Sequence, residues 1–231
     1  MLKKEDLAKK MLYYVVLYAL LLSGFFLMAM GSIIRVYSAL GVAPWDVLHT
    51  GLANHLPITI GQASIGLGGV LIVISLFLGV KPYIGTILNM IFIGTFMDMI
   101  VKWGWFQPVP DSLALRIIFV VLGSVFTAIG SAIYFSTNLK YGPRDSLMMG
   151  IRNHTGWSVG VTRTVMEVSV ILIGWAMGGM FGLGTIFYSL TIGWFLQFFI
   201  FWVSRIKRTT PLKLFKAKFH DLEEKDEATN T

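Results

Sequence analysis

Residues 43–55 read APWDVLHTGLANH, and residues 142–154 read GPRDSLMMGIRNH. Both stretches contain the pattern P-x-D-x-L-x-x-G-x-x-N-H, and each lies between long apolar segments. A helix of about 12 residues extends about 18 Å, which is roughly half of a bilayer. The pattern therefore predicts two short helices, neither of which is long enough to cross a membrane.

The composition of the chain indicates a membrane protein. Of its 231 residues, 55% are hydrophobic and 13% are charged, and the mean hydropathy is +0.72. Such a chain has too few polar side chains to cover a soluble globule. We therefore expect an all-α polytopic membrane protein. Six runs are long enough to cross about 30 Å of hydrocarbon, and they lie at 12–34, 59–79, 83–101, 113–136, 158–178 and 180–203.

The first apolar run follows a basic start, as a secretory signal does. It is too long for the apolar region of a signal peptide, and no A-x-A cleavage pattern follows it. We interpret it as a span that is retained in the protein. Cysteine is absent, which excludes disulfides and thiolate metal sites.

The two quoted stretches belong to a longer internal repeat. Position 44 aligns with position 143, and the same offset of 99 residues aligns the two halves of the chain without a gap. Apolar residues can match through composition alone, but Pro, Asp, Asn, His and many Gly in one register indicate a duplication. The aligned glycines include Gly24 with Gly123, Gly31 with Gly130, Gly61 with Gly160, Gly79 with Gly178 and Gly94 with Gly193.

Each repeat contains one span, one short helix and two further spans. Three crossings is an odd number, so the second repeat is predicted to be inserted upside down relative to the first. With a cytoplasmic start, six crossings place most Lys and Arg residues inside and leave only Arg35 and Lys102 outside. We expect six transmembrane helices in two inverted-topology repeats, at about 12–101 and 113–203, with both termini in the cytoplasm.

The segment 204–231 is predicted to be a cytoplasmic tail. It is basic at first and acidic towards its end, so we expect its first part on the anionic inner leaflet and the rest to be partly disordered. The net charge of +7 reflects such membrane flanks, and no nucleic-acid partner is expected. The lipid bilayer is the predicted partner, together with an unknown small molecule or ion, and a homo-oligomer is left open.

The polar residues of the repeats are the candidate substrate-binding residues, because inverted repeats with short helical pieces are typical of transporters. Asp46 and Asp145 follow prolines that suit the first turn of a helix. Each carboxylate can cap its helix or bind a substrate or ion, since intramembrane carboxylates are usually functional. Both roles stay open. The complete candidate set is Asp46, His49, Asn54, His55, Asn89, Arg144, Asp145, Asn153, His154, Arg163 and Glu167.

Several candidates have a structural alternative. Asn54 with His55, and the equivalent Asn153 with His154, can cap the last turns of the short helices or handle a proton or ligand. Arg163 and Glu167 are four residues apart on one helix face, where they can neutralise each other or form a gate or anion site.

Two further expectations concern charge and metals. Arg144 lies beside Asp145, whereas Asp46 has only Trp45 beside it, so we expect Asp46 to have no adjacent cation. His49 is replaced by Met148 in the second half, and no HExxH spacing occurs. No metal site and no cofactor are therefore predicted.

A family resemblance rests on LGVAPWDVLHTGL, KPYIGTILN, YGPRDSLMMGI and SVGVTRTVME, in this order. The chain resembles the YczE branch of the bacterial YczE/YyaS/YitT membrane-protein family from about residue 12 to 203. The resemblance implies a multi-pass protein of the bacterial plasma membrane, in a family that mostly lacks an assigned substrate. Some relatives are discussed as exporters, so it also implies transport. It brings no catalytic residues.

The leading functional prediction is a secondary transporter or exporter of an unknown small solute. No P-loop is present, so an ion gradient or a substrate gradient would drive it. A channel is one alternative, because half-helices also build pores. A membrane-embedded assembly factor or enzyme is the other. An enzyme is not expected, because no nucleophile and base constellation is visible.

Overall fold

The computed structural model describes residues 4–109, 112–137, 139 and 142–209, and these ranges form eight α-helices. Six of the helices are long and apolar enough to cross a membrane. The predicted all-α class and the six spans are confirmed within a few residues, with the first span longer than predicted. The long helices are α1 (Lys4–Ser38), α3 (Ile60–Phe77), α4 (Ile84–Trp103), α5 (Leu113–Ser136), α7 (Val159–Ala176) and α8 (Leu183–Thr209). The predicted tail is helical up to Thr209, and 210–231 lies outside the described residues.

The two short helices are present as predicted. They are α2 (Pro44–His55) and α6 (Pro143–Thr155), with 12 and 13 residues. Each begins with proline, whose fixed φ suits the first helical position and whose missing N–H has no helical partner there. Helix α2 packs on α3 and α7, and α6 packs on the same two helices.

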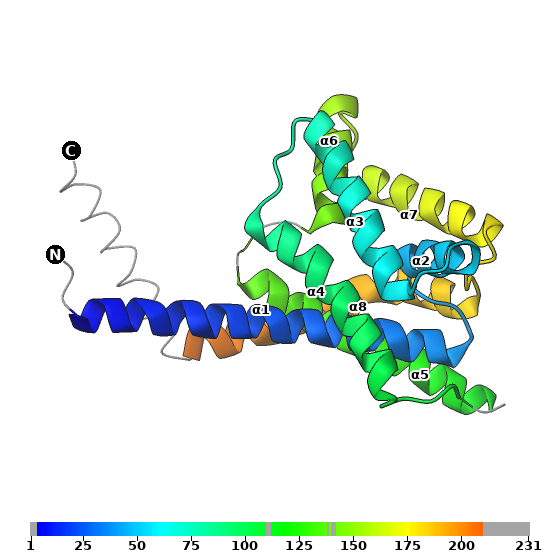
Figure 1. The fold of residues 1–231 in the computed structure, drawn as a ribbon, viewed down its shortest axis with the longest axis horizontal. Coiled ribbons are helices and arrows are strands. Elements are labelled where there is room, and N and C mark those ends of the chain that lie inside the picture. Colours follow the sequence, from blue (N-terminus) through cyan, green and yellow to red (C-terminus); the bar gives the residue numbers. More distant parts are fainter. Residues whose placement is uncertain (1–3, 110–111, 138, 140–141, 210–231) are drawn as a thin grey trace.

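Helices α1 and α5 form the most extensive helix pair of the protein (Figure 1). Gly24 lies against Gly130, and Gly31 lies against Gly123. A Cβ atom at Gly31 would collide with the carbonyl oxygen of Gly123, so the two backbones are in direct contact. Small residues permit this close approach between membrane helices. The pairing of low with high residue numbers means that α1 and α5 are antiparallel.

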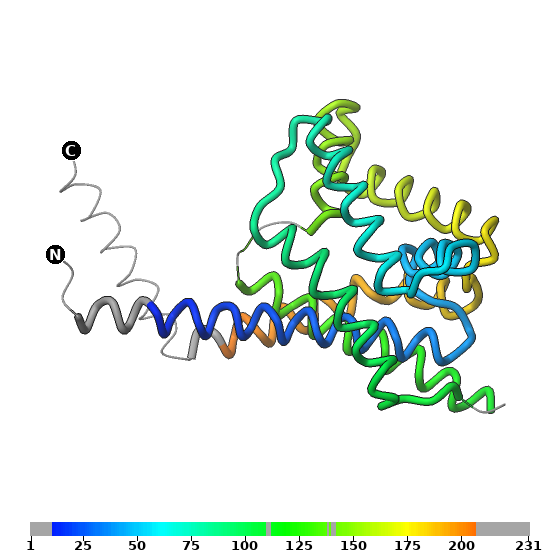
Figure 2. The backbone as a smooth tube through the Cα atoms, in the orientation of Figure 1, coloured from blue at the N-terminus to red at the C-terminus, as the bar shows by residue number. Residues whose placement is uncertain are grey.

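The remaining helices are arranged around this pair. Helix α4 packs on α1, and α8 packs on α5. Helix α3 also packs along α4, whereas α7 and α8 share no comparable packed face in the described ranges. The tube in Figure 2 shows that the start of α1 and the end of α8 extend towards the same side of the molecule.

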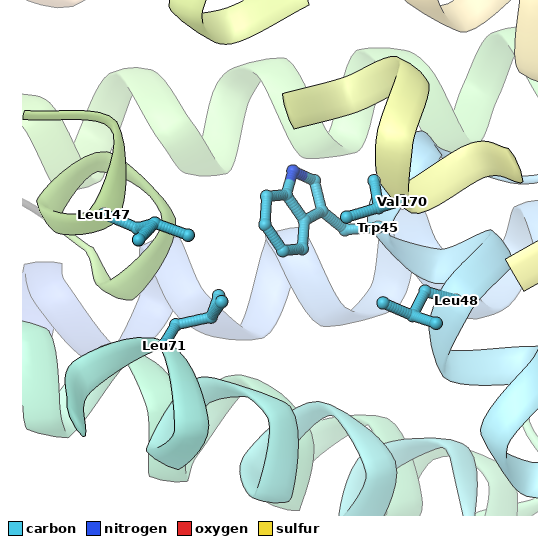
Figure 3. Close-up of a cluster of buried hydrophobic side chains, with 5 residues drawn as sticks. All are labelled: Trp45, Leu48, Leu71, Leu147 and Val170. Carbon is cyan, nitrogen blue, oxygen red and sulfur yellow. The ribbon is translucent and has the colours of Figure 1, made fainter. Parts of the chain in front are cut away.

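A hydrophobic cluster joins the short helices to α3 and α7. Figure 3 shows the indole ring of Trp45 at its centre, with the other side chains around it. These side chains are almost fully buried, which fixes α2 and α6 against their neighbours. The cluster consists of Trp45 and Leu48 from α2, Leu71 from α3, Leu147 from α6 and Val170 from α7.

The outer surface of the spans is apolar. The side chain of Phe77 is 87% exposed, Leu183 and Trp194 are each 77% exposed, and Leu190 is 71% exposed. Monomeric soluble proteins rarely expose such large apolar areas. The surface is consistent with helices that are surrounded by lipid.

Candidate functional site

A cavity of about 210 Å³ lies at the centre of the protein and is lined by side chains from all eight described helices. Most of the predicted site residues line it together with polar residues that the sequence analysis did not select. The predicted residues in the lining are Asp46, His49, Asn89, Arg144, Asp145, Arg163 and Glu167.

Asp46 lies at the centre of a buried polar network. The hydroxyl group of Ser32 donates a hydrogen bond to Oδ2 of Asp46. Nη2 of Arg35 lies 3.5 Å from the same oxygen, and Nδ1 of His49 lies 3.2 Å from Oδ1. Only 5% of Asp46 and 1% of Arg35 are exposed. The carboxylate is therefore held between α1 and α2 by partners on both helices.

Two expectations for Asp46 change with this geometry. The N-terminal cap of α2 is Ala43, with no side-chain hydrogen bond, and the Asp46 carboxylate is bonded instead to Ser32 and His49. The prediction that Asp46 has no adjacent cation is wrong, because Arg35 lies beside it. The neighbouring cation is eleven positions earlier in the chain, so adjacency in sequence could not identify it.

Arg35 is a site residue that the sequence analysis missed. Its assignment to an external flank is wrong, because α1 continues to Ser38 and buries the side chain. Nη1 of Arg35 donates to the carbonyl oxygen of Gly123 at 2.7 Å and to the hydroxyl of Thr127 at 2.9 Å. The guanidinium lies 4.5 Å from the ring centre of Tyr188. The available signal was the apolar sequence on both sides of Arg35, which makes it an intramembrane charge.

Arg144 and Asp145 face the cavity from the first turn of α6. The guanidinium of Arg144 lies 5.0 Å from the ring centre of Trp45 and makes no hydrogen bond or ion pair with any described residue. Asp145 interacts with the backbone of Gly142 and with the more distant charges of Arg163 and Arg144. It forms no side-chain ion pair among the described residues. Both groups are thus available to a ligand.

The predicted ion pair between Arg163 and Glu167 is present on α7. Nε of Arg163 lies 2.8 Å from Oε1 of Glu167, and the two side chains are 54% and 24% exposed. Both residues line the cavity, on the side where α7 does not pack along α8. The pair therefore lies at the open part of the site.

Four predicted residues lie away from the cavity, at the ends of the short helices. Nδ1 of His55 lies 3.1 Å from the carbonyl oxygen of Gly51, as expected for a histidine at a helix end. His154 makes the same contact at 3.0 Å in the second half. The amide of Asn54 donates to the carbonyl oxygen of Gly178 at 2.8 Å. These contacts support a structural role. Neither these three residues nor Asn153 line the cavity.

Asn89 and Tyr188 complete the polar lining of the cavity. Asn89 lies against Gly142 at the start of α6, and Tyr188 lies beneath the guanidinium of Arg35. The two residues occupy equivalent positions in the repeat. Within the part of the chain that the structure describes, no three His, Asp or Glu side chains are grouped as a metal site would require.

The family comparison matches residues 15–201 to a model described as a family of unknown function (DUF6198). The chain belongs to this family. It is 37% identical over 197 residues to the "Uncharacterized membrane protein YczE" of Bacillus subtilis, covering 84% of this chain and 87% of the relative. It is 34% identical over 188 residues to an "Uncharacterized protein" of Haemophilus influenzae, covering 81% and 85%.

A third relative supports the resemblance to the wider family that includes YyaS. The chain is 24% identical over 183 residues to the "Uncharacterized protein YyaS" of Bacillus subtilis, covering 77% of this chain and 89% of the relative. The resemblance to the YczE branch is thus confirmed. No solved structure matches the chain. The family and the six apolar helices together identify a membrane protein.

Proposed function

We propose that the protein is a secondary transporter of a small solute, built from two inverted repeats, with its substrate site in the central cavity. In this proposal it is not an enzyme, it lies in the bacterial plasma membrane, and both termini are cytoplasmic. Residues that are equivalent in the repeat lie together around the cavity, as expected for a site between two repeats. The equivalent pairs in the lining include Ser32 with Ser131, Trp45 with Arg144, Asp46 with Asp145 and Asn89 with Tyr188.

The crossing of α1 and α5 supports the inverted arrangement. Gly24 lies against Gly130, and the equivalents of these residues, Gly123 and Gly31, also lie against each other. Exchanging the two repeats therefore reproduces the same contact. Because α1 and α5 are antiparallel, the exchange also reverses the direction of the helix, which is what opposite membrane orientations require.

The two repeats differ in one helix contact, and this difference supports the proposal that the transporter alternates between two states. Gly61 of α3 and Gly94 of α4 lie directly against each other's backbone. At their equivalents, Gly160 of α7 and Gly193 of α8, a Cβ atom would meet no described atom of another residue within 4 Å. One repeat is closed at this point and the other is open, although both have the small residues that closure needs.

A second state follows from exchanging these arrangements. In the closed repeat, the hydroxyl of Thr59 donates to Asp98 at 2.6 Å, and the N–H of Gly61 donates to the same carboxylate at 3.1 Å. The equivalent residues, Ser158 and Gln197, have side chains that can form the same kind of hydrogen bond. In the second state α7 closes on α8 and α3 separates from α4, which opens the cavity to the other membrane face.

Cysteine crosslinking tests this proposal without knowledge of the substrate, because the chain has no native cysteine. The first double variant is Thr59→Cys with Asp98→Cys, and its matched counterpart is Ser158→Cys with Gln197→Cys. A transporter that alternates forms both disulfides in membranes, and each disulfide abolishes access to the cavity from one face. A channel with one fixed helix arrangement forms only the first. Absence of the second disulfide under all oxidising conditions would overturn the proposal.

A further inference from the structure

The charges around the cavity divide into paired and unpaired groups. Asp46 is paired with Arg35 and contacts Nδ1 of His49, and Arg163 is paired with Glu167. Arg144 and Asp145 have no such partner among the described residues. An unpaired charge in a membrane protein is unfavourable unless a ligand or water compensates it. The chemistry of the ligand is therefore defined by these two groups.

Arg144 provides a site for an anionic group. Its guanidinium is held against the indole ring of Trp45, which fixes its position without using its N–H donors. A planar guanidinium binds a carboxylate through two parallel hydrogen bonds. Arg35 lines the same cavity, and its buried Nε has no acceptor in the described part of the chain.

Asp145 provides a site for a cationic group beside the anion site. Its carboxylate lines the cavity next to Arg144, and its described contacts leave acceptor positions unused. An ammonium group donates three hydrogen bonds and carries the positive charge that would compensate this carboxylate. The two neighbouring residues thus match a ligand that carries both charges.

The overall charge of the lining excludes a strong preference for a ligand with net charge. Three arginines, Arg35, Arg144 and Arg163, balance three carboxylates, Asp46, Asp145 and Glu167. A purely anionic or purely cationic ligand would form a direct ion pair with only one of Arg144 and Asp145. A ligand that carries one positive and one negative group compensates both.

The apolar part of the lining accepts a short side group. Methionine is flexible and polarizable, so it adapts to ligands of different shape. The volume of about 210 Å³ limits the ligand to a small molecule. The methionines in the lining are Met28, Met90, Met97, Met148 and Met166.

We propose that the cavity binds a small amphoteric solute of the amino-acid type, with its carboxylate on Arg144, its ammonium on Asp145 and its apolar group among the methionines. This inference rests on the proposed function, because it takes the cavity to be the substrate site. Binding is nevertheless measurable without transport. If a ligand binds but cysteines at positions 158 and 197 never crosslink, the alternation is overturned and this inference stands. If those cysteines crosslink but no probe binds, this inference is overturned and the alternation stands.

The test uses the full chain, purified in detergent, and isothermal titration calorimetry. The probes are glycine, valine, leucine and methionine, followed by 3-methylbutylamine and 4-methylpentanoate, which are leucine without the carboxylate and without the amine. At least one amino acid is expected to bind saturably. The amine and the acid are expected to bind about tenfold to a hundredfold more weakly, because each lacks one charge-assisted interaction. No binding by any of the four amino acids, or equal binding by the amine or the acid, overturns the inference.

Two variants test which residue binds the carboxylate of the ligand and which residue binds its ammonium group. Arg144→Gln is expected to remove the preference for leucine over 3-methylbutylamine, and Asp145→Asn is expected to remove the preference for leucine over 4-methylpentanoate. Arg152→Gln is the matched control, because Arg152 lies on the same helix, is exposed and does not line the cavity. Loss of all binding in both variants with unchanged unfolding temperature also supports the assignment. Unchanged preferences in both variants contradict it.

Discussion

The guanidinium of Arg144 lies 5.0 Å from the ring centre of Trp45, and the two residues occupy equivalent positions in the two halves of the chain. The first half of the chain therefore contributes the aromatic ring of this contact, and the second half contributes the cation. A cation over an indole face is attracted to it without losing its hydrogen-bond donors. The contact holds Arg144 in place and also joins α2 to α6 across the cavity.

Replacement of Trp45 tests this contact. Trp45→Phe retains an aromatic face, whereas Trp45→Leu removes it and retains an apolar side chain. We expect Trp45→Leu to weaken amino-acid binding by about 0.5–2 kcal/mol relative to Trp45→Phe, because Arg144 loses the ring that positions it. Calorimetric titration with the tightest amino-acid probe measures the difference. Equal affinity in the two variants would show that the ring does not position Arg144.

The buried pair of Arg35 and Asp46 is expected to be structural. Asp46→Asn or Arg35→Gln alone leaves an uncompensated buried charge, which costs about 3–5 kcal/mol in comparable pairs. The double variant removes both charges, so its loss of stability should be clearly smaller than the sum of the single losses. Thermal unfolding of the four proteins in the same detergent measures this. Additive losses would mean that the two charges do not stabilise each other.

Of the two repeated aspartates, Asp145 is expected to be the one whose replacement affects ligand binding without lowering stability. Its carboxylate has no side-chain ion pair among the described residues, whereas Asp46 is tied to α1. Asp145→Asn should leave the unfolding temperature nearly unchanged and reduce amino-acid binding, while Asp46→Asn should lower the unfolding temperature. A large loss of stability in Asp145→Asn, with little loss in Asp46→Asn, would contradict this ranking.

Gly61 makes a close backbone contact and its equivalent Gly160 does not, so the same substitution is expected to have opposite effects at the two positions. A side chain at Gly61 collides with α4 in this state, whereas Gly160 has space around it. Gly160→Leu is therefore expected to fold and to favour the present state, because it blocks closure of α7 on α8. Gly61→Leu is expected to favour the second state. The measurement is the disulfide yield of the two cysteine pairs described above in each background, and identical yields in both backgrounds would argue against a common exchange.

Labelling of single cysteines tests the opposite orientation of the repeats. Leu56 and Thr155 occupy equivalent positions at the ends of α2 and α6, and both are exposed. In intact cells, a membrane-impermeant maleimide is expected to label Leu56→Cys, and Thr155→Cys is expected to react only after permeabilisation. Labelling of both residues from the same face would contradict the inverted arrangement of the repeats.

The spans and the short helices could be predicted because their signals are local. Apolar length determines a span, and Pro44 and Pro143 mark helix starts whatever the surrounding fold. The ion pair of Arg163 and Glu167 was also predictable, since residues four apart in a helix share one face. These features depend on neighbours within one helix.

The Asp46 network could not be predicted in the same way, because its partners come from different helices. The apolar sequence on both sides of Arg35 indicates an intramembrane charge, but it does not identify the groups that Arg35 contacts. Its hydrogen bonds to Gly123 and Thr127 are visible only once α1 and α5 are packed together. The unequal packing of Gly61 and Gly160 also has no sequence signal, since both repeats contain the same residue.

The crossing of α1 and α5 has a consequence for the origin of the chain. Gly24 against Gly130 and Gly31 against Gly123 are the same contact made twice by equivalent residues. An ancestral gene that encoded a single repeat would have produced a surface able to pack against a second copy of itself running in the opposite direction. In the proposed inverted arrangement, fusion of two such genes needed no new contact, only a linker such as the residues between α4 and α5, to join two oppositely inserted copies in one polypeptide.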